Sequence, residues 1–230
     1  MASIVDSFKE SFSDHLAILK FIGLTIPVYY DYHLYMQSKG NFTGFIWLTI
    51  LIALYMLGFL LKITHNVANS KTLVLPSLNP LTIISASFKG LVAVGPMFIF
   101  AYLVANYLCS LINFIPWVTI TLKTIVWIIA AAMFLTPLLT FAVNEKISEA
   151  YNPKVFFEKA GDLIFIILFF VIKFLLLNIV TIGFVGYTLL VLFGFGPIFN
   201  FFVSFALVFN IAVIGHYLGQ VDYELINYNI

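Results

Sequence analysis

Long apolar runs separated by short polar breaks dominate the chain. Residues 42–61 form the clearest run, 20 residues without a charge. As a helix rising about 1.5 Å per residue, such a run spans the roughly 30 Å hydrocarbon layer of a membrane. The runs lack the alternation of lipid-facing and lumen-facing residues that is typical of a membrane β-barrel. The pattern therefore predicts an all-α, polytopic membrane protein.

The polar breaks divide the chain into about six predicted transmembrane helices. The first is the weakest, because Lys20, Pro27 and Asp31 interrupt it. A glycine-rich stretch, from Gly183 to Pro197, predicts a broken connection between the last two, which is either a plain loop or a discontinuous helix. The six crossings are expected at about residues 16–36, 42–61, 91–112, 118–143, 161–182 and 198–218.

A short amphipathic helix is expected ahead of each pair of crossings, lying flat on the membrane. Asp6, Asn79 and Asn152 are candidate N-caps for these helices, and the differences 79 − 6 and 152 − 79 both equal 73. The spacing suggests three repeat units, residues 6–78, 79–151 and 152–225, within one transmembrane domain of residues 1–230. Chance spacing of three common residues is the alternative explanation.

Composition excludes a water-soluble domain. The chain is 63% hydrophobic and 9% charged, against about 45–50% and about 25% in soluble proteins. A net charge of +1 argues against nucleic acid as a partner. Cys109 is the single cysteine, so an intramolecular disulfide is impossible.

The positions of the lysines predict a topology, since arginine is absent. With six crossings, eight lysines share one side with both termini, whereas Lys39 and Lys123 lie on the other. The positive-inside rule then places both termini in the cytoplasm, and we expect a bacterial cytoplasmic membrane. Four lysines on or near the amphipathic helices are expected to contact anionic lipid headgroups: Lys9, Lys89, Lys154 and Lys159.

Two segments carry a family resemblance. The first holds Gly58-Phe59-Leu60-Leu61-Lys62, Leu75-Pro76, Lys89-Gly90 and Pro96 within residues 58–96, and the second is Gly215-His216-Tyr217-Leu218-Gly219. The chain resembles a family of bacterial and archaeal multi-pass membrane proteins known only as a domain of unknown function. The resemblance implies a six-helix membrane bundle and no known activity.

Lys173 is the sharpest candidate for a functional residue, because a lysine well inside an apolar run is costly and often marks a transport path or an ion pair. A lysine that snorkels to the headgroups is the alternative. Asn106, Asn178 and Asn210 also lie in apolar runs, where asparagine commonly forms hydrogen bonds between helices.

The remaining polar clusters predict neither a metal site nor a cofactor. Asp31 and His33 stand two positions apart and do not share a helix face. His216, Asp222 and Glu224 lack the ligand spacing of a known metal site.

Three functions remain open at this point. The preferred one is a non-enzymatic structural, assembly or accessory subunit that contacts membrane lipids and either a partner protein or further copies of itself. The second is a small permease or channel that uses Lys173 and the glycine-rich break. The third is a membrane enzyme acting on lipid, which would need an essential carboxylate among Glu145, Glu149 and Glu158.

Overall fold

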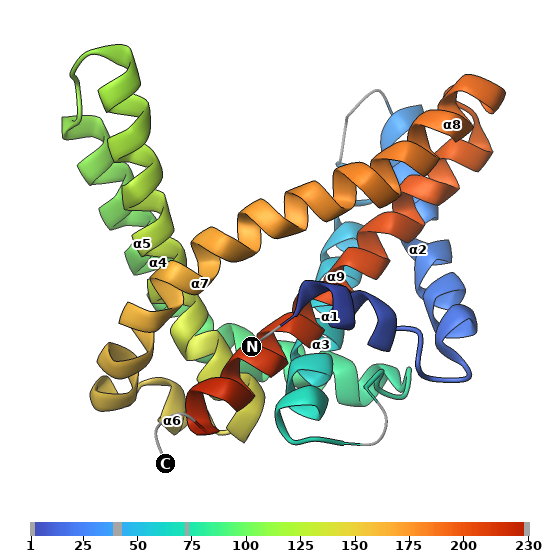
Figure 1. Cartoon of the computed structure of the whole chain (residues 1–230). Coiled ribbons are helices and arrows are strands. Elements are labelled where there is room, and N and C mark those ends of the chain that lie inside the picture. The colour runs from blue at the N-terminus through green and yellow to red at the C-terminus, as the bar shows by residue number, and fades with distance from the viewer. Residues whose placement is uncertain (1–2, 39–42, 72–73, 228–230) are drawn as a thin grey trace. The chain divides into compact units, whose positions relative to one another are not determined.

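A computed structural model describes residues 3–38, 43–71 and 74–227, and every regular element in this part of the chain is helical (Figure 1). In chain order the elements are α1 (Ile4–Glu10), α2 (Ala17–Gln37), α3 (Ile46–Ala68), α4 (Pro80–Leu111), α5 (Pro116–Asn144), α6 (Ile147–Ala150), α7 (Pro153–Asn178), the π-helical turn η1 (Ile179–Gly183), α8 (Phe184–Phe193) and α9 (Pro197–Asn227). The predicted all-α class is confirmed.

Among the described residues, five helices are long and apolar enough to cross a membrane: Ile46–Ala68, Pro80–Leu111, Pro116–Asn144, Lys159–Phe193 and Pro197–Tyr223. The prediction of six crossings is therefore corrected to five. The expected first crossing does form a helix, α2, but Lys20, Pro27 and Asp31 make it more polar than the other five.

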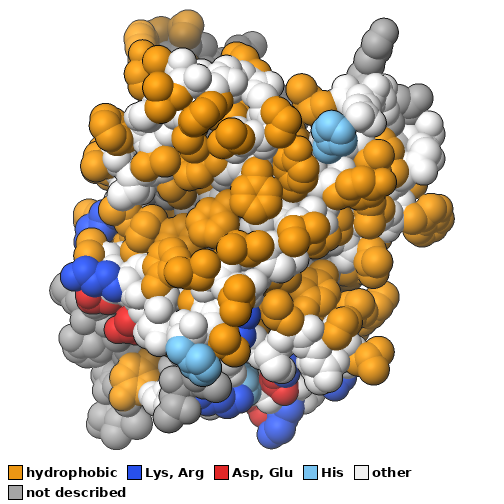
Figure 2. Space-filling model, turned by 90° about the vertical axis from the view of Figure 1, so that its right-hand side faces the viewer, with side chains coloured by type: hydrophobic (Ala, Val, Ile, Leu, Met, Phe, Trp, Pro, Cys, Tyr) orange, Lys and Arg blue, Asp and Glu red, His pale blue; other side chains and the backbone are white. Residues whose placement is uncertain are grey.

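Hydrophobic side chains cover most of the face of the molecule presented in Figure 2, and most of its Lys, Asp and Glu side chains gather toward one end. An apolar band of this kind needs lipid around it, because water would not solvate so much hydrocarbon. With the five candidate spans, it identifies an integral membrane protein.

The chain folds as two compact units, Met1–Ser87 with Lys173–Ile230, and Phe88–Ile172. In the first unit, α9 is the central helix and packs against α3, α2, α1 and α8 (Figure 1). Phe21 from α2, Phe59 and Ile63 from α3, and Phe209 from α9 meet in its buried core.

The second unit contains most of α4, all of α5 and α6, and the first part of α7. Its buried cluster is small and consists of Ala101 and Ala105 from α4 and Ala130 from α5. The Tyr151 hydroxyl donates a 2.6 Å hydrogen bond to the Val92 carbonyl oxygen of α4.

Asparagine starts two of the long helices, as the sequence predicts. Asn79 Oδ1 accepts from the Leu81 N–H at 3.1 Å, and Asn152 Oδ1 accepts from the Lys154 N–H at the same distance. In both helices a proline occupies the first position, where its missing N–H is not needed. The prediction for Asp6 is wrong, because Ser3 is the N-cap of α1 and Asp6 donates its N–H to Ser3 Oγ.

The separate amphipathic segments expected after Asn79 and Asn152 are instead the first turns of α4 and α7, each of which continues without a break. The three-unit repeat stays a prediction.

The expected break between residues 183 and 197 is also shorter than predicted. Gly183 and Gly186 lie inside helical structure, and the chain leaves the helix only at Gly194. Gly194 has φ +63°, a left-handed conformation that glycine adopts without strain. The break is a tight turn that joins α8 to α9.

Candidate functional site

Two glycines bring α9 into close contact with α3. A Cβ on Gly219 would lie 2.6 Å from Val67 Cβ and 2.8 Å from the Thr64 carbonyl oxygen, and one on Gly215 would lie 3.0 Å from the Leu60 carbonyl oxygen. Small residues four apart allow helices to approach closely in membranes. The Gly215-x-x-x-Gly219 pattern is visible in the sequence, where it contributes to the family resemblance and could also have indicated this helix contact.

His216 lies between these two glycines and is 1% exposed. Its Nδ1 is 3.1 Å from Ser7 Oγ of α1, and its Nε2 is 2.9 Å from Glu10 Oε2. The contact with Glu10 is an ion pair only when the imidazole is protonated, and Nε2 makes no well-directed hydrogen bond. Ser7 Oγ also donates to the Ser3 carbonyl oxygen at 2.9 Å, so its single hydroxyl proton is shared between that oxygen and the imidazole as acceptors, or Nδ1–H donates to Ser7 Oγ.

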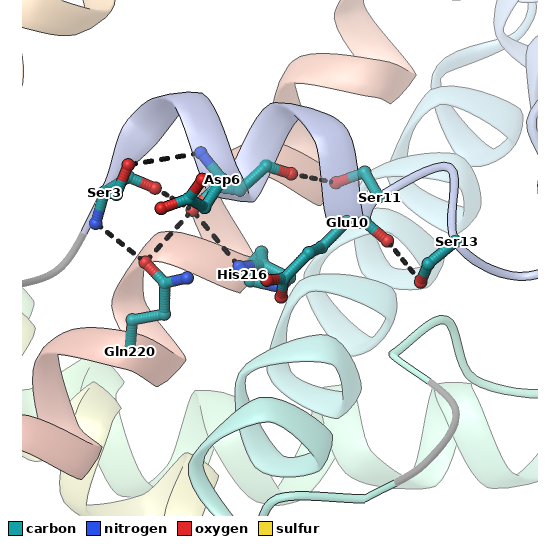
Figure 3. A network of polar contacts seen from close by, with 8 residues as sticks. Ser3, Asp6, Glu10, Ser11, Ser13, His216 and Gln220 are labelled. Atoms are coloured by element: carbon teal, nitrogen blue, oxygen red, sulfur yellow. Dashed lines mark hydrogen bonds and ion pairs between the residues drawn. The ribbon is translucent and has the colours of Figure 1, made fainter.

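Gln220, one turn further along α9, extends the network to the start of α1 (Figure 3). Its Oε1 accepts a 2.9 Å hydrogen bond from the Ser3 backbone N–H and lies 3.4 Å from Ser7 Oγ. The network therefore holds α1 against the C-terminal half of α9 through polar contacts. Sequence reasoning did not find it, because its two sides are more than 200 residues apart.

A second polar contact fixes the start of α2. Lys20 Nζ donates to Asp14 Oδ2 and to the Leu75 carbonyl oxygen, the latter at 3.2 Å, while the Leu16 N–H donates to Asp14 Oδ1 at 2.9 Å. The hydrogen bond from Lys20, and next the one from Leu16, holds the pKa of Asp14 below its ordinary value. The ionised pair anchors the loop before α2 to the segment before α4.

Lys173 lies on an open groove of about 560 Å³ in the first unit. The groove continues along Leu176, Leu177 and Val180. Its other wall is formed by Ser3 and by the first two residues of α1, Ile4 and Val5. The side chain of Lys173 is exposed.

The three candidate asparagines do not bond between helices in the described structure. Asn106 donates to the Tyr102 carbonyl oxygen and Asn178 to that of Phe174, each at 2.9 Å and each within its own helix. Asn210 is half-buried, and its Oδ1 lacks a hydrogen-bond partner among the described residues.

The four lysines predicted to contact headgroups lie on three helices. Lys9 on α1, Lys89 on α4 and Lys154 on α7 are exposed, and Lys159 on α7 is half-exposed. Their contact with lipid stays a prediction.

Two of the three carboxylates from which a lipid enzyme would need one have described side chains. Glu145 caps α5 in a left-handed conformation, with φ 53°, and Glu149 pairs with Lys146 at 3.2 Å. The side chain of Glu158 lies outside the described part. Among the described residues, three or more His, Cys, Asp or Glu side chains nowhere gather as metal ligands would.

A smaller groove, of about 180 Å³, lies in the second unit between α4 and α5. Its floor is made of alanines and its walls are aromatic, with Tyr102 and Trp127 rings 6.0 Å apart. The lining residues are Phe98, Ala101, Tyr102, Trp127, Ala130, Ala131 and Phe134.

Fold and sites together define an integral membrane protein with five candidate spans, a polar network at α1 and α9, and two open apolar grooves. Comparisons with protein families, curated proteins and solved structures found no match. The resemblance to the family of unknown function stays a prediction.

Proposed function

We propose that this protein is a non-enzymatic subunit of a membrane assembly and that α4 and α5 bind a transmembrane helix of a partner chain. The observation that carries the proposal is the groove between these helices, where half-exposed aromatic rings lie over buried alanines. Its aromatic walls offer the large, rigid contact surfaces that dominate binding energy at interfaces.

The packing of the second unit supports this function. Where α4 and α5 border the groove, the buried cluster consists of three alanines, whereas large buried side chains such as Leu139 and Phe141 lie further along α5. Tyr102 is 50% exposed and Trp127 is 42% exposed, although both border the groove. Dispersion contacts and small-residue packing, rather than the hydrophobic effect, drive helix association in lipid. The aromatic rings beside the groove offer dispersion contacts, and the alanines between them are small residues of the kind found where helices pack.

Trp127→Ala tests the proposal, and Trp117→Ala is a matched control because Trp117 lies on the same helix, is 81% exposed and does not line the groove. Each variant is extracted mildly from its own membrane and examined by native mass spectrometry. We expect a protein partner or a second copy to remain bound in the wild type and in Trp117→Ala, and to be lost in Trp127→Ala.

Two outcomes would overturn the proposal: a wild-type protein that is always monomeric and free of other proteins, or equal loss of the partner in both tryptophan variants. The unfolding temperature of each variant in detergent separates a lost interface from a damaged fold, since only the latter lowers it strongly.

The cellular placement is part of the same proposal. The lysines of the two long polar breaks, among them Lys71, Lys146 and Lys154, support a cytoplasmic membrane with those breaks facing the cytoplasm. Fusion of a reporter enzyme to the C-terminus, active only in the cytoplasm, tests it.

A further inference from the structure

The end of α7, η1 and α8 form one arm of a helical hairpin, and α9 forms the other, with the turn at Gly194 between them. Counted from this turn, residues 174–193 of the first arm and residues 197–215 of the second are about 20 and 19 residues long. Each corresponds to about 30 Å of helix. The two arms run antiparallel, as shown by the closeness of Gly186 to Phe202. Lys173 and His216 therefore lie at a similar level, about one hydrocarbon thickness from the turn.

Helix α1 lies at this same level. It contacts His216 through Ser7 and Gln220 through Ser3, and it carries three charged side chains, Asp6, Lys9 and Glu10, within seven residues. Short helices of this polarity lie at the interface between headgroups and hydrocarbon. Measured from the turn, Lys173 lies about one hydrocarbon thickness away, and the candidate span continues beyond it to Lys159. A headgroup at this level would remove the large cost of a lysine at the bilayer centre.

The groove next to Lys173 has a charged end and an apolar length. Lys173, Leu176, Leu177 and Val180 are spaced i, i+3, i+4 and i+7, so they follow one face of the helix from the headgroup level toward the turn. Ile4 and Val5 of α1 close the groove at its charged end. Its volume, about 560 Å³, lies in the range of small-molecule sites.

We propose that this groove binds one anionic phospholipid of the surrounding leaflet, with the phosphate on the Lys173 ammonium and an acyl chain along Leu176, Leu177 and Val180. The groove matches a phospholipid in charge and polarity, which supports this occupant. The Lys173 ammonium can pair with the phosphate, and Leu176, Leu177 and Val180 can contact the acyl chain. Among the described residues that line the groove, Lys173 carries the positive charge.

The site is separate from the partner groove of the second unit, so either proposal stands if the other fails.

Lys173→Gln tests the charge, and Leu177→Trp fills the apolar part. Lys123→Gln is the matched control, since it removes a half-exposed lysine from a candidate span without lining this groove. The purified full-length protein is titrated with phosphatidylglycerol or phosphatidylcholine of identical chains, and bound lipid is counted by native mass spectrometry. We expect one phosphatidylglycerol to bind the wild type in preference to phosphatidylcholine. Affinity should fall by about fivefold or more in Lys173→Gln, as expected for one lysine at a lipid surface, and also in Leu177→Trp, with little change in Lys123→Gln.

Equal affinity for the two lipids would overturn the proposal, and so would an equal loss in Lys173→Gln and Lys123→Gln, which would indicate a general attraction to negative charge. Displacement of phosphatidylglycerol by millimolar inorganic phosphate would also overturn it, because the acyl chain would then contribute nothing. Leu177→Trp keeps the lysine, so its result separates loss of the groove from loss of the charge.

Discussion

The backbone N–H of Ser3 donates a 2.9 Å hydrogen bond to Oε1 of Gln220, which joins the start of the chain to the end of its last long helix. Helix α2 then runs antiparallel to α9, as the ring pairs Phe21–Phe209 and Tyr29–Phe201 show. The first described helix therefore lies beside the C-terminal end of α9, although an odd number of crossings, the five candidate spans, would place the two on opposite sides of the membrane.

Cysteine labelling tests this arrangement. With Cys109→Ala as background, Ser13→Cys and Tyr223→Cys both present an exposed position. We expect a membrane-impermeant maleimide to modify both from the same side in sealed inverted vesicles and neither in intact cells. Opposite accessibility of the two positions would contradict the Ser3–Gln220 contact.

Replacing Gly219 by alanine should destabilise the first unit. The new Cβ would lie 2.6 Å from Val67 Cβ, so α3 and α9 would have to separate. Overpacking of this kind costs about 1–3 kcal/mol. Gly95→Ala is the control, because its Cβ would meet nothing within 4 Å. Thermal unfolding in detergent should show a lower midpoint for Gly219→Ala alone, and equal midpoints would refute the close contact.

Removing the imidazole of His216 should free α1 from α9. In His216→Leu, Glu10 loses its contact and Ser7 loses one of its hydrogen-bond partners, and a lost hydrogen bond costs about 0.5–1.5 kcal/mol. We expect faster amide hydrogen exchange in residues 4–10, measured by mass spectrometry. His15→Leu serves as control, since its side chain is 81% exposed. If both variants exchange at the wild-type rate, the network does not hold α1.

The ends of the helices were predictable to the extent that local chemistry determines them. The Asn79-Pro80 and Asn152-Pro153 pairs start α4 and α7 because each asparagine caps its own helix. Ser3, rather than Asp6, is the N-cap of α1, through its Oγ. Its backbone N–H also donates to Gln220 Oε1, a contact that local sequence cannot reveal.

Burial and partners were less predictable, because they depend on contacts distant in sequence. Gly183 and Gly186 suggested a break, yet glycine is common inside membrane helices, and the helix continues to Phe193. The sequence predicts that the fifth crossing ends at residue 182, which places Lys173 well inside it. The helix instead extends to Phe193, and Lys173 lies 20 residues before that end, within the candidate span Lys159–Phe193. Its depth in the membrane stays a prediction.

The Asp14–Lys20 pair should make stability depend on pH. The pKa of Asp14 is lowered in the folded state, mainly by the hydrogen bond from Lys20, from an ordinary value of 3.8. Its stabilising effect is therefore complete above about pH 4 and is lost as the pH falls through the lower, folded-state pKa. Asp14→Asn should cost about 1–3 kcal/mol at pH 7, since a hydrogen bond to a charged group is lost, and the difference from wild type should shrink below pH 4.

Unfolding in detergent, followed by intrinsic fluorescence between pH 3 and pH 7, measures this difference. Glu149→Gln is a suitable control, because it breaks an exposed pair with Lys146 and should change stability by at most about 0.5 kcal/mol. A difference between Asp14→Asn and wild type that persists unchanged to pH 3 would mean that the asparagine disturbs packing rather than charge. The lysine would then anchor α2 mainly through its hydrogen bond to the Leu75 carbonyl oxygen.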